Sequence, residues 1–450
     1  MIYMLMKWSR FNHITKSSKY GNFIFNSVTN SFVKVENELL DKLMNVQNWN
    51  IELNSLDEPL QSMLVNHRII VPDHYDEDII RQKKYLKAVS SFNTNYVGLT
   101  VATTTACNFK CPYCYEEGVV ANNMSIEVES AILSHIKSIH KPVEITWYGG
   151  EPLMNWPTIE RITTALSAMR NDVDYILITN GYLLTPEKCD FFANVKLKHI
   201  QITIDGLECT HNKTRILKNN AGSYSTIMKN IDYALKALPN TFISIRVNIG
   251  HHNKEEYPKL RNEIYTRWKD YRCNIGVHFA FIVDYQGCSP NCLSTCQRLE
   301  YISELFHSHN IISRDIIPEN NTGICCANKY DSFVIGPDGL LYKCWVDIGK
   351  KDKIVGTIFD LPKISNLKIL SDYYGEDKYS SQKCLNCFML PLCGGLCPAA
   401  KSTLPQNDQC PYNNKYFDDV LEMYYEILVS AQDPESDLVK NKKILLNGNK

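Results

Sequence analysis

The chain has 450 residues, and its charges nearly cancel, with 48 Lys and Arg against 49 Asp and Glu. Balanced and interspersed charges do not make the basic patch that binds nucleic acid. No apolar run approaches the length of a membrane span, and Met1–Trp8 lacks the features of a signal peptide. The 17 cysteines of so large a chain are therefore expected to be reduced, metal-binding thiols of a cytoplasmic protein rather than disulfides of a small secreted scaffold.

Residues 1–90 are predicted to form a small winged-helix-like domain. Two strands of a hairpin are followed by two short helices and a last strand, because apolar residues alternate and then recur at helical spacing. The predicted elements are strands at Phe23–Phe25 and Phe32–Val35, a helix around Leu39–Leu43, a helix at Leu60–Val65 and a strand at Ile69–Val71. The charged stretch Asp73–Lys87 is predicted to be a linker.

Residues 91–285 alternate apolar strands with helices. The predicted strands are Val97–Thr103, Val143–Trp147, Tyr175–Thr179, His199–Ile204, Phe242–Val247 and Ile275–Ile282. The predicted helices between them include Glu127–Ile139, Trp156–Met169, Tyr224–Leu238 and Glu255–Trp268. Six β/α units in sequence predict an α/β fold with a parallel sheet, closed as a partial (β/α)6 TIM-like barrel. In such folds the functional site lies at the carboxyl ends of the strands.

Residues 286–450 are rich in cysteine and loops. A region with so little apolar periodicity is expected to need metal in order to fold, so a third, metal-binding domain is predicted here. A final amphipathic helix is predicted over Tyr416–Ser430.

Cys107, Cys111 and Cys114 follow the first predicted barrel strand, in the run CNFKCPYCY. Three thiolates on one loop bind three irons of a 4Fe–4S cluster and leave the fourth iron free for a small molecule. A zinc site is the alternative, but zinc requires a fourth ligand, and no second C-x2-C or His pair follows nearby.

The C-x3-C-x2-C spacing, with Tyr113 before the last cysteine, resembles the signature of the radical S-adenosylmethionine (SAM) superfamily. The resemblance implies that the amino and carboxylate groups of SAM complete the open iron. It also implies that an electron from a donor such as flavodoxin or ferredoxin cleaves SAM, which yields a 5′-deoxyadenosyl radical that abstracts hydrogen from the substrate.

Further motifs stand at the ends of successive strands. Gly149-Gly150-Glu151-Pro152 is similar to the GGEP motif that positions the SAM amino group. The segments after the third and fourth strands, the latter with His211 downstream, are similar to those that contact the SAM ribose and carboxylate. The candidate SAM-binding residues are Tyr113, Gly149, Gly150, Glu151, Asn180, Thr203, Asp205, Arg215 and Arg246. A turn or capping role is the alternative for each.

A second array of cysteines lies in the last third of the chain. It comprises Cys326, Cys344, Cys384, Cys387, Cys393, Cys397 and Cys410. The array resembles the SPASM domain, which implies two auxiliary 4Fe–4S clusters and three clusters in all. By this resemblance, Cys384, Cys387, Cys393 and Cys410 hold the distal cluster, and Cys326, Cys344 and Cys397 hold the one nearer the barrel. A turn at Pro337-Asp338-Gly339 is predicted to return Cys344 beside Cys326. A zinc ribbon is the alternative.

The fourth ligand of the nearer auxiliary cluster stays open. Asn320 stands where some relatives have a cysteine, and Cys325 directly precedes Cys326. A further triplet, Cys288, Cys292 and Cys296, is spaced C-x3-C-x3-C, and we expect at least one auxiliary ligand from it. Cys189, Cys209 and Cys273 are isolated and are interpreted as ordinary buried residues.

The N-terminal order of hairpin and helices is similar to the RiPP recognition element, which binds the leader of a ribosomal precursor peptide by strand addition. The resemblances together imply a peptide maturase, with a thioether crosslink of the sactipeptide or ranthipeptide kind as the leading product. The alternatives are carbon–carbon or carbon–oxygen crosslinking, epimerisation and sulfatase maturation. Trp345 counts against the last, because sulfatase-maturing enzymes carry Asp at that position. A zinc-stabilised binding protein without catalysis is the alternative from another class.

Overall fold

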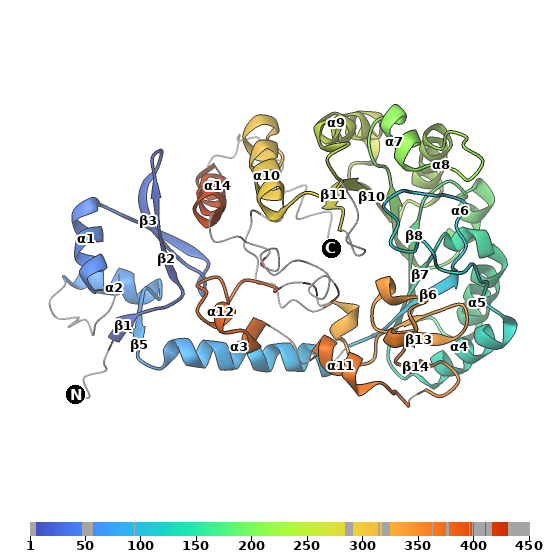
Figure 1. Cartoon of the computed structure of the whole chain (residues 1–450), viewed down its shortest axis with the longest axis horizontal. Coiled ribbons are helices and arrows are strands. Elements are labelled where there is room, and N and C mark those ends of the chain that lie inside the picture. The colour runs from blue at the N-terminus through green and yellow to red at the C-terminus, as the bar shows by residue number, and fades with distance from the viewer. Residues whose placement is uncertain are drawn as a thin grey trace.

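The computed structural model describes residues 6–46, 57–93, 95–283, 291–313, 316, 325–361, 363–374, 378–395, 397, 399, 410 and 416–430. In Figure 1 the N-terminal elements lie on the left and a parallel sheet with its helices lies on the right. Helices α10 (Thr295–His309) and α14 (Phe417–Ser430) lie between them. Cys288 and Asn320 are outside the described residues.

Six parallel strands form the main sheet and pair with one another in chain order. They are β6 (Val97–Thr104), β7 (Val143–Gly149), β8 (Val173–Thr179), β9 (Leu197–Thr203), β10 (Phe242–Ile249) and β11 (Ile275–Phe281). The helices between them are α4 (Ile126–Ser138), α5 (Trp156–Met169), α6 (Pro186–Phe192), α7 (Glu208–Thr214), α8 (Tyr224–Ala237) and α9 (Tyr257–Arg267). The predicted α/β fold with a parallel sheet is confirmed.

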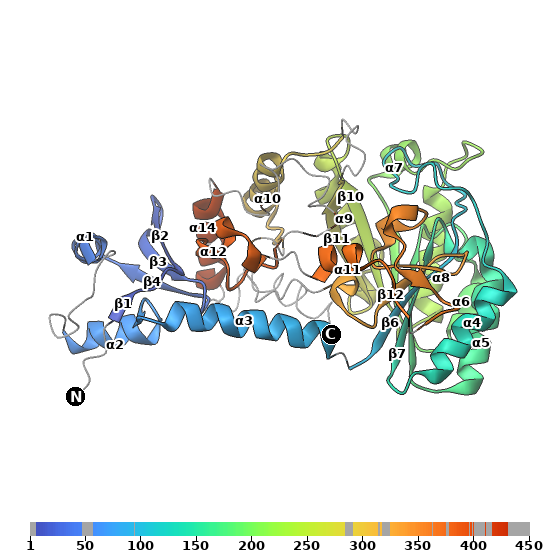
Figure 2. The ribbon, with the colours of Figure 1, turned by 60° about the horizontal axis from the view of Figure 1, so that its bottom comes forward.

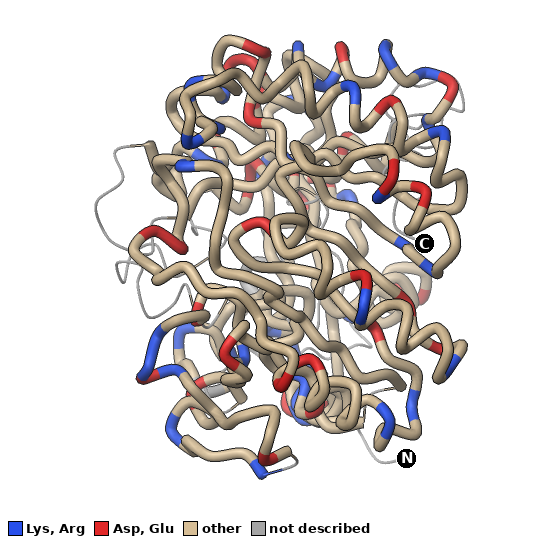
Figure 3. The backbone as a smooth tube through the Cα atoms, turned by 90° about the vertical axis from the view of Figure 1, so that its right-hand side faces the viewer, with Lys and Arg blue, Asp and Glu red and all other residues tan. Residues whose placement is uncertain are grey.

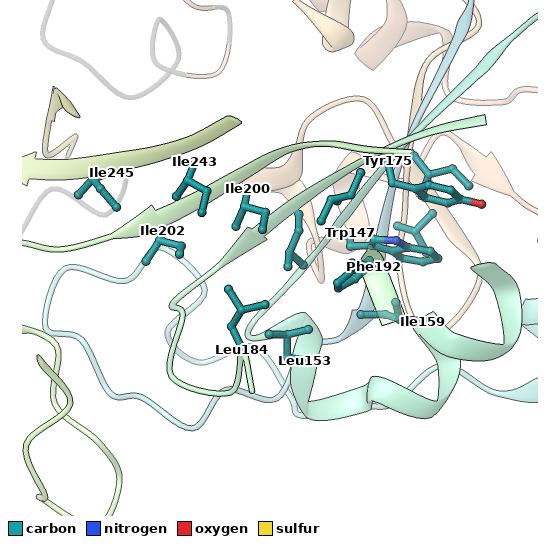
Figure 4. Close-up of a cluster of buried hydrophobic side chains, with 14 of the residues drawn as sticks. Trp147, Leu153, Ile159, Tyr175, Leu184, Phe192, Ile200, Ile202, Ile243 and Ile245 are labelled. Carbon is teal, nitrogen blue, oxygen red and sulfur yellow. The ribbon is translucent and has the colours of Figure 1, made fainter. Parts of the chain in front are cut away.

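The main hydrophobic core fills the space between this sheet and its helices (Figure 4). Ile200 and Ile202 are alternate residues of β9 and pair with Ile243 and Ile245 of β10, and all four are fully buried. Alternate residues of a strand share one face, so these isoleucines form a continuous apolar layer. Burial of such side chains contributes about 1.5–3 kcal/mol each and holds the strand ends in fixed positions.

A hairpin from the cysteine-rich region extends the parallel sheet at its other side. Strand β12 (Phe333–Ile335) pairs with β6, and the antiparallel strands β13 (Leu340–Tyr342) and β14 (Gly356–Thr357) follow. The predicted turn is confirmed, and Gly339 adopts φ +79°, a value that favours glycine. Backbone hydrogen bonds therefore tie the cysteine-rich region to the barrel, which the sequence did not predict.

The N-terminal region contains two small antiparallel sheets. Strands β2 (Asn12–Ser17), β3 (Gly21–Asn26) and β4 (Ser31–Val35) form one, and β1 (Met6–Trp8) with β5 (Ile70–Pro72) forms the other. Ile24 of β3 packs towards α1 (Asn37–Val46) and α2 (Glu58–Asn66), whereas Phe23 and Phe25 pack towards α14. The N-terminal sheet thus shares a hydrophobic cluster with the end of the chain. Strands β1 and β2 were not predicted, because β2 reads as a polar loop.

The predicted linker Asp73–Lys87 lies largely within α3 (Tyr75–Phe92), a helix of 18 residues that runs from the N-terminal elements to the barrel (Figures 1 and 2). Three acidic residues occupy its first turn and favour the positive end of the helix dipole. At that end Asp76 is buried and accepts hydrogen bonds from Ser9 Oγ (2.7 Å) and the Arg10 amide (2.9 Å). At the other end the Tyr330 amide donates to the Ser91 carbonyl (2.8 Å).

Basic and acidic residues are interspersed along the backbone seen from the barrel side (Figure 3). This distribution agrees with the balanced composition of the chain. Among the described residues, no helix combines the length and the apolar character required to cross a bilayer.

Candidate active site

The three-cysteine loop begins directly after β6. The Lys110 amide donates to the Ile216 carbonyl (2.8 Å), and the Lys218 amide donates to the Asn108 carbonyl (2.9 Å). These bonds fix the loop to the segment that follows α7. Cys107 and Cys114 each interact electrostatically with Cys111, so the structure brings the three thiols together at the carboxyl end of the sheet.

Burial raises the pKa of Cys107 to about 12 and that of Cys114 to about 11, and it also raises the pKa of Cys111. Such thiols become thiolates when a metal stabilises their charge. Among the described residues, no three His, Cys, Asp or Glu side chains are grouped as ligands of a single metal ion. A 4Fe–4S cluster does not require that grouping, because each thiolate binds a different iron.

Gly149 and Gly150 lie against the start of the cysteine loop. A Cβ atom on Gly149 would stand 2.1 Å from the Thr104 carbonyl oxygen, and one on Gly150 would stand 2.5 Å from that of Ala106. The Gly150 amide donates to the Thr104 carbonyl (3.0 Å), and the Glu151 amide donates to the Ala106 carbonyl (2.9 Å). The close approach is therefore to the protein's own backbone, and contact of these glycines with SAM stays a prediction.

Glu151 is fully buried and joins the ends of β7 and β8. Its carboxylate accepts hydrogen bonds from Thr179 Oγ1 (2.7 Å), the Asn180 amide (2.7 Å) and the Leu153 amide (3.1 Å). Burial raises the pKa of Glu151, and these donors oppose the rise. The carboxylate is engaged by the chain's own donors, so its predicted contact with the SAM amino group stays a prediction.

Asp205, Tyr113 and Arg215 form a hydrogen-bonded group beside the cysteine loop. The Tyr113 hydroxyl donates to Asp205 Oδ2, and Arg215 Nη1 donates to the Tyr113 oxygen (3.2 Å). Asp205 is fully buried; burial raises its pKa, and Arg215 opposes the rise. The Arg215 guanidinium lies 5.3 Å from the centre of the Phe109 ring. Its Nε atom is buried and has no hydrogen-bond partner among the described residues, and contact of Arg215 with SAM stays a prediction.

His211 fixes the backbone of this group. Its Nδ1 accepts a hydrogen bond from the Asp205 amide (3.3 Å), so the proton of the neutral ring is on Nε2. That Nε2–H donates to Ser223 Oγ (3.1 Å), whose hydroxyl donates to the Arg215 carbonyl (3.1 Å). Burial lowers the pKa of His211 to about 3, so the ring remains neutral at physiological pH.

Two remaining candidates lie at the margin of this group. Thr203 ends β9 and is buried, and Arg246 on β10 donates from Nε to Asn248 Oδ1 (2.9 Å). Sequence reasoning missed Asn108, which accepts from Asn180 Nδ2 (2.8 Å), and Asn248, whose amide donates to Asp205 Oδ1 (2.8 Å). Only their positions in the sequence could have indicated them, because Asn108 directly follows a cysteine and Asn248 directly follows a predicted strand.

The seven cysteines of the second array fall into two neighbourhoods. Cys387 and Cys393 each interact with Cys384 and Cys410. Cys344 interacts with Cys397 and Cys325, and Cys326 interacts with Cys344. The same cysteines are grouped in the ligand sets that the SPASM resemblance implies, except that Cys325 also lies in the second neighbourhood. That these groups hold 4Fe–4S clusters stays a prediction.

Cys325 and Cys326 are themselves in contact. Hydrogen bonds from Cys326 and from the Ala327 and Asn328 amides lower the pKa of Cys325 to about 6, although burial opposes this. The same contact and burial raise the pKa of Cys326. Cys296 lies beside Tyr416, whose pKa this contact raises to about 12. Of the isolated cysteines predicted to be buried, Cys189 is buried, but the prediction is wrong for Cys209 and Cys273, which are exposed.

Trp345, which directly follows Cys344, stacks on Tyr148 with ring centroids 5.4 Å apart. Because Tyr148 directly precedes the glycine motif, this stacking joins that motif to the segment that contains Cys344. Asp347 is buried and accepts a hydrogen bond from the Tyr373 hydroxyl (2.6 Å). Burial raises the pKa of Asp347, and the Tyr373 hydrogen bond opposes the rise.

Comparison with known proteins identifies a family and several proteins that resemble parts of this chain. The family described as "Radical SAM superfamily" matches residues 101–264. The chain is 23% identical over 335 residues to "Radical SAM cyclopropyl synthase TigE" of Paramaledivibacter caminithermalis, which covers 67% of this chain and 68% of that protein. It is 22% identical over 326 residues to "Cysteine-type anaerobic sulfatase-maturating enzyme" of Clostridium novyi, which covers 65% of this chain and 84% of that protein.

Among solved structures, "Native anSMEcpe with bound AdoMet and Kp18Cys peptide" superposes with a TM-score of 0.57 at 18% identity, over 74% of this chain and 96% of that one. This likeness concerns the fold. The three clustered cysteines at the end of the first parallel strand, the α/β fold and the matched family agree. Residues 101–264 are therefore a radical SAM domain, and the chain is an enzyme.

Proposed function

We propose that this enzyme modifies a ribosomal precursor peptide and most readily closes a thioether crosslink within it. The observation that carries the proposal is the grouping of Cys107, Cys111 and Cys114 beside the unused donor of Arg215. The three thiolates would hold a 4Fe–4S cluster with SAM on its open iron. When bound, this pair supplies a 5′-deoxyadenosyl radical that abstracts a hydrogen atom from the substrate.

The chain's own residues would bind and orient SAM. Arg215 offers a guanidinium donor to the SAM carboxylate, and Asp205 and His211 hold its surroundings in place through Tyr113 and the backbone. Glu151 fixes the ends of two strands next to the loop. Gly149, Gly150, Asn180, Thr203 and Arg246 complete the proposed SAM-binding set.

The auxiliary cysteines would serve the second half of the oxidation. Closing a carbon–sulfur bond breaks one C–H and one S–H bond. The hydrogen atom leaves with 5′-deoxyadenosine, the thiol proton goes to solvent, and the remaining electron needs an acceptor. We assign that role to the two proposed auxiliary 4Fe–4S clusters, with flavodoxin or ferredoxin as the external donor for SAM cleavage. Thiols that must stay reduced for this purpose favour the cytoplasm.

Support for a peptide substrate comes from two directions. The solved structure named above contains a bound peptide, and a second relative bears the name of a sulfatase-maturating enzyme. In addition, β4 is an edge strand within the described residues, which suits the addition of a leader peptide as a further strand. We therefore propose three domains: residues 1–90 for the leader, 91–285 for radical formation and 286–450 for the auxiliary clusters.

Carbon–carbon bond formation is the second candidate. The relative named as a cyclopropyl synthase favours it. Both reactions remove two hydrogen atoms from the peptide, so mass alone does not separate them. Alkylation with iodoacetamide does, because a thioether consumes a cysteine thiol and a carbon–carbon bond leaves it free.

The decisive test is anaerobic reconstitution of the full chain with iron, sulfide and SAM. We expect about twelve irons per chain, from three clusters, and formation of 5′-deoxyadenosine. Cys114→Ala should abolish 5′-deoxyadenosine, whereas Cys273→Ala, at an exposed and isolated cysteine, should not. A precursor peptide encoded beside this gene should lose two hydrogen atoms and one reactive thiol. SAM cleavage that persists in Cys114→Ala would refute the assignment of the radical-forming cluster.

A further inference from the structure

The loop between Cys387 and Cys393 consists of five apolar residues. They are Phe388, Met389, Leu390, Pro391 and Leu392. Phe388 is half-buried and the other four are buried. Connecting loops normally run over the surface and expose polar side chains, so this one must be covered by other parts of the chain. In Figures 1 and 2, α12 (Gln382–Leu385), which precedes the loop, lies beside the N-terminal sheet.

The N-terminal sheet supplies part of this cover. Met389 and Leu392 belong to the same hydrophobic cluster as Phe23 and Phe25 of β3. Both phenylalanines are fully buried, although β3 belongs to a small sheet that has little core of its own. The loop therefore helps to complete the core beneath β3.

A second hydrophobic cluster joins the loop to other N-terminal elements. Leu390 belongs to it together with Phe11, which directly precedes β2 and is fully buried. Ile79 and Ile80 of α3 pack against the same cluster. Side chains of one short loop thus reach two separate clusters of the N-terminal region.

Phe388, which directly follows Cys387, makes direct contacts with the N-terminal sheet. Its ring stacks on that of His13 in β2, with centroids 4.2 Å apart and an angle of 13° between the planes. The Ser27 hydroxyl, directly after β3, donates to the Phe388 carbonyl. His13 Nε2 also donates to Asp418 of α14 (2.8 Å). Both the side chain and the backbone of the loop therefore hold β2 and the end of β3.

The loop is compact, and its two ends are cysteines of the proposed distal cluster. The Leu390 amide donates to the Cys387 carbonyl (3.1 Å), and the Cys393 amide donates to the Met389 carbonyl (2.8 Å). Lys378 Nζ donates to the Leu390 carbonyl (3.1 Å). A metal cluster that binds both cysteines would fix both ends of this short loop and remove much of its conformational freedom.

We propose that the loop between Cys387 and Cys393 couples the distal cluster to the leader-binding sheet. The cluster fixes the loop, the loop holds β2 and β3, and β4 pairs with β3. The affinity for the leader peptide therefore depends on the distal cluster. Linkage requires that a bound leader strengthen the binding of that cluster by the same factor. The inference rests on the proposed function, which supplies both the distal cluster and the leader.

The test compares the full-length wild type with the double variant Cys387→Ala and Cys393→Ala after anaerobic reconstitution. Cys114→Ala is the matched control, because each variant should lose about four of about twelve irons but from a different cluster. Fluorescence anisotropy with the leader of the precursor peptide encoded beside this gene measures the affinity. Hydrogen–deuterium exchange measures the protection of β2 and β3.

We expect the double variant to bind the leader about tenfold more weakly than the wild type and to exchange faster in β2 and β3. Exchange in the barrel strands should stay unchanged, which shows that the rest of the protein is folded. Cys114→Ala should match the wild type in leader affinity and in the exchange of β2 and β3.

Phe388→Ala separates the contact of the loop from the metal. This variant keeps every proposed ligand and should hold about twelve irons, yet it should bind the leader more weakly and exchange faster in β2. Phe359→Ala is the matched control, because that ring is 56% exposed. Wild-type affinity and exchange in Phe388→Ala would show that the loop does not carry the coupling.

Three further outcomes overturn the proposal. They are about twelve irons in the double variant, wild-type leader affinity and exchange in the double variant, and an equal loss of affinity in Cys114→Ala. Failure of the proposed function would look different. In that case the wild-type protein itself would hold no more than about four irons or would not bind the leader.

Discussion

At the scale of single residues, the site depends on a neutral histidine, His211, that holds the backbone of Asp205 and Arg215 in place. His211 accepts a hydrogen bond from the backbone amide of Asp205 and donates one to Ser223 Oγ, and the Ser223 hydroxyl donates to the carbonyl of Arg215. A protonated ring would lose the acceptor at Nδ1 and add a positive charge near Arg215. The surrounding burial prevents this, because it holds the pKa of His211 at about 3.

This burial predicts how stability depends on pH. The unfolded chain protonates His211 near pH 6.5 and the folded protein does so only near pH 3, so the stabilisation is complete above pH 6.5 and is lost as pH falls. From pH 7 to pH 5, the wild-type free energy of unfolding should fall by about 2 kcal/mol more than that of His211→Gln. Urea unfolding of both proteins at the two pH values measures the difference. Equal losses would contradict the prediction.

Spacing in the sequence identified candidate site residues that lie close together along the chain. Cys107, Cys111 and Cys114 were recognised because one loop of eight residues contains all three. Asn248 and Arg215, by contrast, reach the same group from distant elements, and no local pattern reports that they share Tyr113.

At the scale of elements, the glycine turn after β7 and the cysteine loop after β6 are held in backbone contact. Gly150 has no side chain to separate them, and an added Cβ would lie 2.5 Å from the Ala106 oxygen. The contact fixes the backbone directly before Cys107, the first cysteine of the loop. The turn after β7 is thus a support for the loop, whether or not it also touches SAM.

Gly150→Ala should therefore displace the cysteine loop. We expect the variant to lose about four of about twelve irons and to form at least tenfold less 5′-deoxyadenosine. Gly356→Ala is the matched control, because its added Cβ meets no atom nearer than 3.4 Å. Iron analysis and chromatography of 5′-deoxyadenosine measure both effects. Wild-type values in Gly150→Ala would show that the loop tolerates the shift.

Strand addition at β4 makes a different prediction, about the leader peptide. A peptide that pairs with an edge strand donates every second amide to it, so N-methylation of successive leader residues should weaken binding at alternate positions. Fluorescence anisotropy with the full-length enzyme measures the affinity of each methylated peptide. A loss without a period of two residues would exclude pairing of this kind.

The elements also show why sequence patterns succeeded in the barrel and failed beside it. The bounds of the helix Trp156–Met169 were predicted correctly. Its apolar face packs on the sheet, so apolar residues recur at helical spacing in the sequence. Helix α3 has a polar surface over most of its length, so its charged sequence read as a linker. Pairing of β12 with β6 joins residues more than 200 positions apart, and three-residue strands give no signal for their partner.

At the scale of the whole molecule, the barrel and the cysteine-rich region differ in what holds them. The barrel has a continuous apolar core, whereas residues 378–397 contribute few buried apolar side chains, among them Met389 and Leu392. Iron removal should therefore leave the barrel folded and loosen this segment first. Hydrogen–deuterium exchange before and after chelation measures the difference. Equal protection of both regions after chelation would contradict the prediction.

Helix α3 has a consequence for which residue of a substrate is modified. It spans about 27 Å without interruption, and hydrogen bonds fix both of its ends, at Asp76 and at Ser91. A helix of constant length keeps the proposed leader-binding edge β4 and the proposed radical-forming loop at a fixed distance from each other. The distance of a residue from the leader would then decide whether it is modified. Two residues inserted between leader and target should move the modification by two positions toward the leader.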